Sequence, residues 1–136
     1  PYIYVSPFPW LHLLKKRLKI SIYDISEVVI MKTAVEQYIP LTEPQYYILL
    51  SLLKPIHGYG IMQEVENLTH GEVKLGPGTL YGIIKKLLTE ELIDEVASID
   101  RKKCYVLTPL GKEVLELELK RLQRSVQNGL SLFYGE

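Results

Sequence analysis

Residues 76–88 read Gly76-Pro77-Gly78-Thr79-Leu80-Tyr81-Gly82-Ile83-Ile84-Lys85-Lys86-Leu87-Leu88, and this stretch decides the fold. It predicts a helix that begins abruptly, with Gly76 as the cap and Pro77 as the first helical residue, where a missing N–H group costs nothing. At about 100° per residue, the aliphatic side chains gather on one side: Leu80, Ile83, Ile84, Leu87 and Leu88. The other side carries small, polar and basic residues, with Tyr81 at its border: Gly78, Thr79, Gly82, Lys85, Lys86 and Thr89.

The polar side of this predicted helix has no acidic residue before Glu90. Its glycines and Thr79 let a large surface approach closely, which is what a helix entering a DNA major groove needs. The alternative interpretation is a short amphipathic surface helix with two lysines. The stretch by itself leaves both interpretations open.

Size and charge limit the function classes. A chain of 136 residues with 47% apolar residues predicts one domain with a modest core and excludes a disordered tail. The 16 basic and 16 acidic residues cancel, and residues 31–136 alone carry 12 basic and 14 acidic side chains. Overall charge therefore does not indicate nucleic acid, so any DNA-binding argument rests on where the charges lie.

The sequence offers little chemistry of other kinds. One cysteine, Cys104, allows no internal disulfide and no cysteine metal cluster, which fits a reducing, cytoplasmic setting. No apolar run is long enough to span a membrane. No catalytic constellation is apparent, and the three histidines (His12, His57 and His70) are far apart in sequence. We therefore expect neither an enzyme nor a metal or cofactor site.

Residues 1–30 differ from the rest of the chain. They lack a starting Met, contain three prolines and Trp10, and carry a basic cluster at residues 15–19. A basic amphipathic helix on a membrane and an N-terminal arm on DNA are two interpretations. We favour a third, in which Met31 is the natural start and residues 1–30 are an atypical extension. We assign no function to Trp10 or to the basic cluster.

Two helices are predicted before residue 76. Thr42-Glu43-Pro44-Gln45 predicts a helix start with Thr42 as the cap and Gln45 reaching back as in a capping box, and the helix ends before Pro55. A second helix is expected to open at Ile56 and to end at residues 70–71, with His57 in a capping or packing role. Followed by the helix at 77–88, it gives a helix-turn-helix pattern.

A β-hairpin is predicted next, from two short segments rich in β-branched and aromatic residues, 93–97 and 104–107. The connection between them ends in a basic tip: Arg101, Lys102 and Lys103. Beside a helix-turn-helix such a hairpin is a wing, and its tip is where phosphate contacts are expected. A solvated turn is the alternative.

The last helix is predicted to start at Thr108-Pro109. An apolar stripe recurs along it at intervals of four, three and four residues: Leu115, Leu119, Leu122 and Val126. Nothing follows in the chain to cover so wide a face, so a second copy of the protein is expected to do so. Packing back on its own domain is the alternative. The predicted fold is mainly α with a small β-hairpin, a winged helix-turn-helix (31–108) with a C-terminal dimerisation helix and tail (109–136).

The chain resembles the PadR family of bacterial transcriptional regulators. The resemblance covers roughly residues 41–122 and is carried by four pieces in order: His57-Gly58-Tyr59-Gly60-Ile61, Gly76 to Tyr81, Leu92-Ile93, and Arg101 to Gly111. It implies a winged-helix homodimer of the smaller subfamily that binds an inverted-repeat operator on double-stranded DNA, usually as a repressor, and that in some members responds to a small hydrophobic or aromatic effector. Tyr46 and Tyr47 are the candidate residues for binding such an effector, and ordinary packing is the alternative for both.

The resemblance also implies site residues. Carried over by position, one group lies on or near DNA: Tyr59, Thr79, Tyr81, Lys85 and Lys86, with Arg101, Lys102 and Lys103 at the backbone. Leu115, Leu119, Leu122 and Val126 form the dimer seam.

Two positions depart from the family pattern: Gly82 replaces a frequent Pro, and Glu91 replaces a frequent Gly. If the turn at position 91 needs a residue in the left-handed conformation, Glu91 lowers the stability of the fold by about 1 kcal/mol. Four acids near the wing (Glu90, Glu91, Asp94 and Glu95) would also repel the phosphates of DNA unless their side chains face away from it. They support a competing hypothesis, a winged helix that serves as a protein-interaction module without sequence-specific DNA binding.

Overall fold

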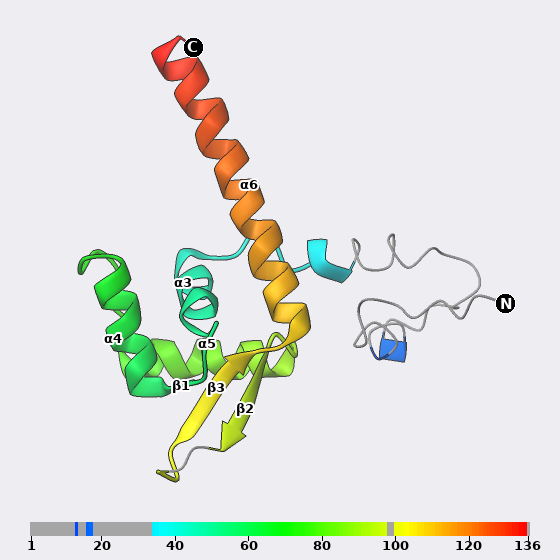
Figure 1. Ribbon diagram of the computed structural model, residues 1–136, viewed down its shortest axis with the longest axis vertical. Helices are drawn as coiled ribbons and strands as arrows, with labels where there is room; N and C mark the ends of the chain where they lie inside the picture. Colours follow the sequence, from blue (N-terminus) through cyan, green and yellow to red (C-terminus); the bar gives the residue numbers. More distant parts are fainter. Residues whose placement is uncertain (1–12, 14–15, 18–33, 98–99, 136) are drawn as a thin grey trace, which may run out of the picture.

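The computed structural model of the protein describes residues 13, 16–17, 34–97 and 100–135 (Figure 1). The elements follow in the order α3 (Glu43–Ser51), β1 (Ile56–His57), α4 (Gly58–Leu68), α5 (Pro77–Thr89), β2 (Ile93–Ala97), β3 (Lys103–Leu107) and α6 (Pro109–Tyr134). Trp10, Met31, Lys15 and Lys19 lie outside the described residues. The expected native start at Met31 therefore stays a prediction.

The start of α3 is fixed by the predicted capping box. The Thr42 N–H donates to Oε1 of Gln45 at 3.0 Å, and the Gln45 N–H donates to Oγ1 of Thr42 at 3.3 Å. These two bonds satisfy backbone donors that a helix N-terminus otherwise leaves unpaired. The helix ends at Ser51, four residues before Pro55, and buries Ile48 and Leu49 in the core.

The sheet has three strands in the order β1-β3-β2, all antiparallel. The prediction that Ile56 opens a helix was wrong, because Ile56 and His57 pair with Tyr105 and Cys104 of β3 and α4 begins only at Gly58. Pairing with the free edge of β3 gives these two residues backbone partners, whereas the N–H groups of a first helical turn have none. Sequence periodicity gives no sign of such an edge.

The hairpin of β2 and β3 confirms the predicted wing, with β3 starting one residue earlier than expected, at Lys103. Ile93 pairs with Leu107 at the base, and Ala97 pairs with Lys103 near the tip. Arg101 in the turn has a φ of 58°, in the left-handed region. Residues 98–99 lie outside the described part of the chain.

The core lies between α3, α4, α5 and the first third of α6, and the base of the sheet closes it. α6 contributes Leu110, Val114 and Leu115 to this core, whereas all its side chains from Gln123 to Tyr134 are exposed. Figure 1 shows this C-terminal half projecting away from the other elements. At 26 residues α6 is about 39 Å long. None of the described helices is long and apolar enough to cross a membrane.

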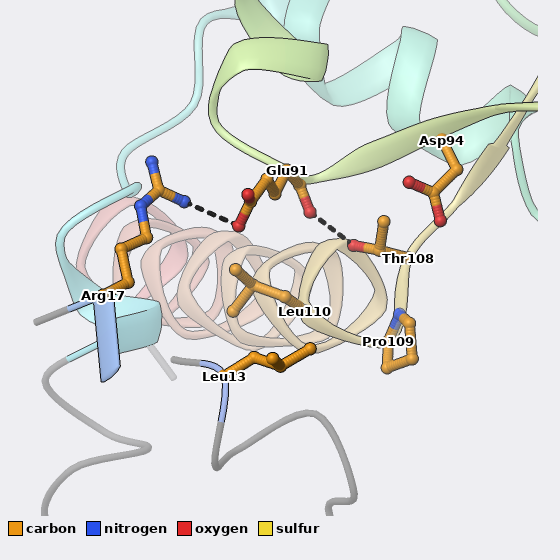
Figure 2. A pocket seen from close by; sticks show the side chains of 7 residues that line it. All are labelled: Leu13, Arg17, Glu91, Asp94, Thr108, Pro109 and Leu110. Carbon is orange, nitrogen blue, oxygen red and sulfur yellow. Dashed lines mark hydrogen bonds and ion pairs between the residues drawn. The ribbon is translucent and has the colours of Figure 1, made fainter. Parts of the chain in front are cut away.

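The chain between α5 and β2 is fastened to the start of α6 (Figure 2). The Thr108 N–H donates to the Leu92 carbonyl at 3.1 Å, and the Thr108 hydroxyl donates to the Glu91 carbonyl at 2.7 Å. Thr108 also caps α6 by accepting from the Gly111 N–H at 2.9 Å, which confirms the predicted helix start. Glu91 has a φ of 60°, so the turn does need a left-handed residue at the position where the family often has Gly.

A buried carboxylate joins α6 to the loop before α3. Glu118 is 1% exposed and accepts hydrogen bonds from the Leu41 N–H and from Nε of Arg121. A charge is tolerated in such a place only when it is paired and hydrogen-bonded. Glu118 therefore holds the loop leading into α3 against the middle of α6.

The close approach at Gly111 gives a stability prediction. A Cβ added there would lie 1.9 Å from the Leu92 carbonyl oxygen. This is a backbone atom, and it cannot move without breaking the junction, by which we mean the contacts of Glu91 and Leu92 with Thr108 and Gly111. Gly111→Ala is therefore expected to lower the free energy of unfolding by roughly 3 kcal/mol, measured by urea denaturation.

Gly129→Ala in the exposed half of α6 is the matched control, because nothing lies within 4 Å of the added Cβ. It is expected to raise stability, by up to about 1 kcal/mol. Equal effects of the two substitutions would contradict the proposed role of the junction.

Candidate nucleic-acid interface

α5 divides into a buried and an exposed face as the sequence predicts. Leu80, Ile84 and Leu87 are at most 2% exposed. The opposite side is open to solvent: Gly78, Thr79, Tyr81, Gly82, Lys85, Lys86 and Thr89. A Cβ added at Gly78 or Gly82 would meet no atom within 4 Å, so the middle of this face is open for a large surface to approach. Both glycines of α5 therefore lie on its solvent-exposed face.

The two lysines of α5 lie on opposite flanks of the exposed face, because neighbours in a helix are about 100° apart. Lys86 lies 3.9 Å from the Glu90 carboxylate, one turn along the helix. Lys85 makes no ion pair with any of the described residues and lies one turn after Tyr81, on the same flank of the helix. Of these two lysines, only Lys86 has an acidic partner among the described residues.

Tyr81 connects α5 to the N-terminus of α4. Its hydroxyl oxygen lies 2.5 Å from where a Cβ on Gly58 would be, so the tyrosine tip rests on the bare backbone of that residue. Tyr59, the next residue of α4, is 60% exposed. The His-Gly-Tyr-Gly sequence therefore makes room for a tyrosine from the next helix.

The wing tip is exposed at all three predicted residues, Arg101, Lys102 and Lys103. The acids near the wing are partly compensated: Glu90 by Lys86, and Glu91 by Arg17 at 3.1 Å. Asp94 and Glu95 are exposed neighbours on β2 and so point to opposite faces of the sheet.

The structure brings four of the predicted residues together around one cavity of about 330 Å³: Tyr59, Tyr81, Lys102 and Lys103. Three residues that sequence reasoning did not assign to the site complete its lining: His57, Gly58 and Tyr105. Their signal in the sequence is weak, because Tyr105 looks like an ordinary strand residue until its partner strands are known. Thr79, Lys85, Lys86 and Arg101 do not line this cavity.

The predicted dimer seam splits into two parts. Leu115 is 6% exposed and belongs to the core of its own chain. Leu119 and Val126 are 51% and 58% exposed, and Leu122 lies half-buried between them. Leu130 and Phe133 continue the same stripe on the projecting half of α6 and are also exposed.

The predicted effector residues pack on each other. The rings of Tyr46 and Tyr47 meet edge to face with centroids 5.2 Å apart. Burial raises the pKa of Tyr46 above its usual value. An effector site at these tyrosines stays a prediction. Among the described residues, no group of three histidine, cysteine or acidic side chains could hold a metal ion.

A helix-turn-helix followed by a hairpin and a long C-terminal helix defines the class of winged-helix regulators. The pattern of the transcriptional regulator PadR-like family matches residues 48–117, from α3 into α6. The chain belongs to this family.

The chain is also similar to two uncharacterised proteins and to a solved structure of a PadR family regulator. Over 88 residues the chain is 33% identical to uncharacterised protein X of Lysinibacillus sphaericus, covering 62% of this chain and 80% of that one. Over 70 residues it is 36% identical to an uncharacterised 37.1 kDa protein in transposon Tn4556 of Streptomyces fradiae, covering 52% of this chain but only 20% of that protein. The crystal structure of a PadR family transcription regulator from Clostridium difficile superposes with a TM-score of 0.57 at 27% identity, covering 68% of this chain and 99% of that one.

The contact between Tyr81 and Gly58 gives a test of the interface. Gly58→Ala places a Cβ against the Tyr81 hydroxyl, and the flexible end of the tyrosine must move away. The free energy of unfolding is expected to change by less than about 1 kcal/mol, while duplex affinity falls by a factor of roughly five, about 1 kcal/mol. Fluorescence anisotropy and urea denaturation measure the two effects. A well-folded Gly58→Ala protein with unchanged affinity would remove this contact from the interface.

Proposed function

We propose that the protein is a homodimeric, PadR-like transcriptional repressor that binds an inverted-repeat operator through α5 and the wing. The observation that carries the proposal is the exposed face of α5, which is free of acids, open at Gly78 and Gly82 and adjacent to the basic wing tip. A helix with these properties fits a major groove, and a hairpin beside it can contact the flanking phosphates.

The dimer is supported by the apolar stripe on α6. Leu119, Leu122, Val126, Leu130 and Phe133 follow at intervals of three, four, four and three residues, which keeps them on one side of the helix. Most of them lie on the half of α6 that touches no other element of the described chain (Figure 1). A two-fold dimer through this stripe would present two copies of α5, and an inverted repeat has the matching symmetry.

A protein-interaction module without sequence-specific DNA binding is the second candidate. It is favoured by the net charge of zero and by the acids Asp94 and Glu95 on the wing strand. It predicts no preference for any duplex, because weak contact through the basic tip alone would be sequence-independent.

Binding to DNA separates the two candidates. The protein is expected to bind the duplex upstream of its own gene more tightly than a scrambled duplex at physiological salt, with two chains per site, as measured by fluorescence anisotropy. Lys85→Ala should lower the slope of log affinity against log salt by about 0.9 per protomer, because it removes one phosphate contact. Lys86→Ala should lower it less, since Glu90 already compensates that charge. Equal, salt-sensitive binding to both duplexes would favour the interaction module.

The dimer has its own test. Val126→Glu places a charge in the apolar stripe of each protomer, and an uncompensated buried charge costs on the order of 3 kcal/mol. The dissociation constant of the dimer, measured by sedimentation, is expected to rise by roughly a hundredfold. Asn128→Glu adds the same charge on the opposite side of the helix and serves as the control. A dimer equally stable in both variants would exclude this stripe from the interface.

A further inference from the structure

The cavity between α4, α5 and the wing has features of an anion site. It is bordered by the N-terminus of α4, an 11-residue helix with His57 at the cap position. The His57 side chain makes no capping hydrogen bond. The first N–H groups of α4 therefore keep their donor capacity, at the helix end where the dipole favours negative charge.

A buried hydroxyl in the same cavity lacks a partner. Tyr105 is 4% exposed and lines the cavity, yet its hydroxyl makes no hydrogen bond within the described chain. A buried polar group without a hydrogen-bond partner is unfavourable, and a ligand acceptor would supply the missing partner. Burial raises the pKa of Tyr105, so the hydroxyl stays protonated at neutral pH and is a hydrogen-bond donor.

The charges around the cavity favour an anion. Lys102 and Lys103 border it from the wing, and the half-exposed side chains of Tyr59 and Tyr81 complete this part of the lining. Glu95, the cross-strand partner of Tyr105 on β2, is exposed and is not part of the lining. The lining itself contains these two lysines and no acidic side chain.

The cavity also lies where DNA would pass. Tyr81 belongs both to its lining and to the exposed face of α5, and Lys102 and Lys103 belong both to its lining and to the wing tip. A strand of DNA bridging α5 and the wing would run across its mouth. The acceptor available there is the phosphodiester group.

We propose that this cavity holds one phosphate of the DNA backbone, bound by the Tyr105 hydroxyl, the first amides of α4 and the two wing lysines. The inference rests on the proposed function and deepens it. Since phosphate contacts carry no sequence information but fix register, Tyr105 is a positioning residue that sets how α5 lies in the groove.

Tyr105→Phe tests the proposal because it removes only the hydroxyl and keeps the ring. A hydrogen bond to a charged group is lost, so affinity for both the native and the scrambled duplex is expected to fall by roughly tenfold. The salt slope should stay unchanged, because tyrosine is neutral, whereas Lys103→Gln should lower it by about 0.9 per protomer. Thermal stability of the free protein should not fall, since the hydroxyl has no partner there. Tyr134→Phe removes the hydroxyl of an exposed tyrosine at the end of α6, outside the cavity, and is the control that should bind as the wild type does.

A scan with single methylphosphonate linkages identifies the phosphate. At one position in each half-site the neutral linkage should weaken the wild type more than it weakens Tyr105→Phe, because the variant has already lost one of the bonds to that phosphate, so that the two changes are not additive. Additive penalties at every position, or unchanged affinity of Tyr105→Phe beside a wild type that binds DNA, would overturn this proposal alone. A wild type that binds neither duplex would overturn the proposed function and this proposal with it.

Discussion

The structure depends on the contact between the backbone at Leu92 and the first turn of α6. The Leu92 carbonyl accepts the Thr108 N–H, and the space beside it admits no side chain at Gly111. Leu92 itself is fully buried, and its own N–H donates to the Leu87 carbonyl at the end of α5. One peptide segment thus joins the end of α5, the base of the wing and the start of α6.

This junction has a consequence for regulation. α5 and the wing form the candidate DNA surface, while α6 carries the exposed apolar stripe, and the two meet at packed backbone atoms rather than at a flexible linker. Glu118 adds a second connection, since it holds Leu41, just before α3, against α6. A change in the angle of α6 would therefore be transmitted to α5 through closely packed backbone atoms.

Arg17 links the N-terminal extension to the same region. It donates to the Glu91 carboxylate at 3.1 Å and to the Glu90 carbonyl at 3.3 Å, beside the cavity lined by Leu13 and Leu110 (Figure 2). The energetic contribution of this ion pair is small, because both side chains are well exposed and exposed ion pairs contribute about 0–1 kcal/mol. Glycine would be less strained than Glu91 at this turn. Unlike glycine, however, Glu91 has a side chain that pairs with Arg17.

The sequence by itself determined the elements whose signals are local. The capping box at Thr42, the Gly-Pro start of α5, its two faces, the wing hairpin and the cap at Thr108 depend on neighbours within a few residues, so periodicity and cap chemistry predict them. Only the tertiary structure decided that Ile56 and His57 form an edge strand, that Leu115 belongs to its own core and that Tyr105 lines a cavity with Tyr81. These outcomes depend on which distant backbone edge or side chain arrives at a residue, and a pattern within one segment carries no information about its partners in space.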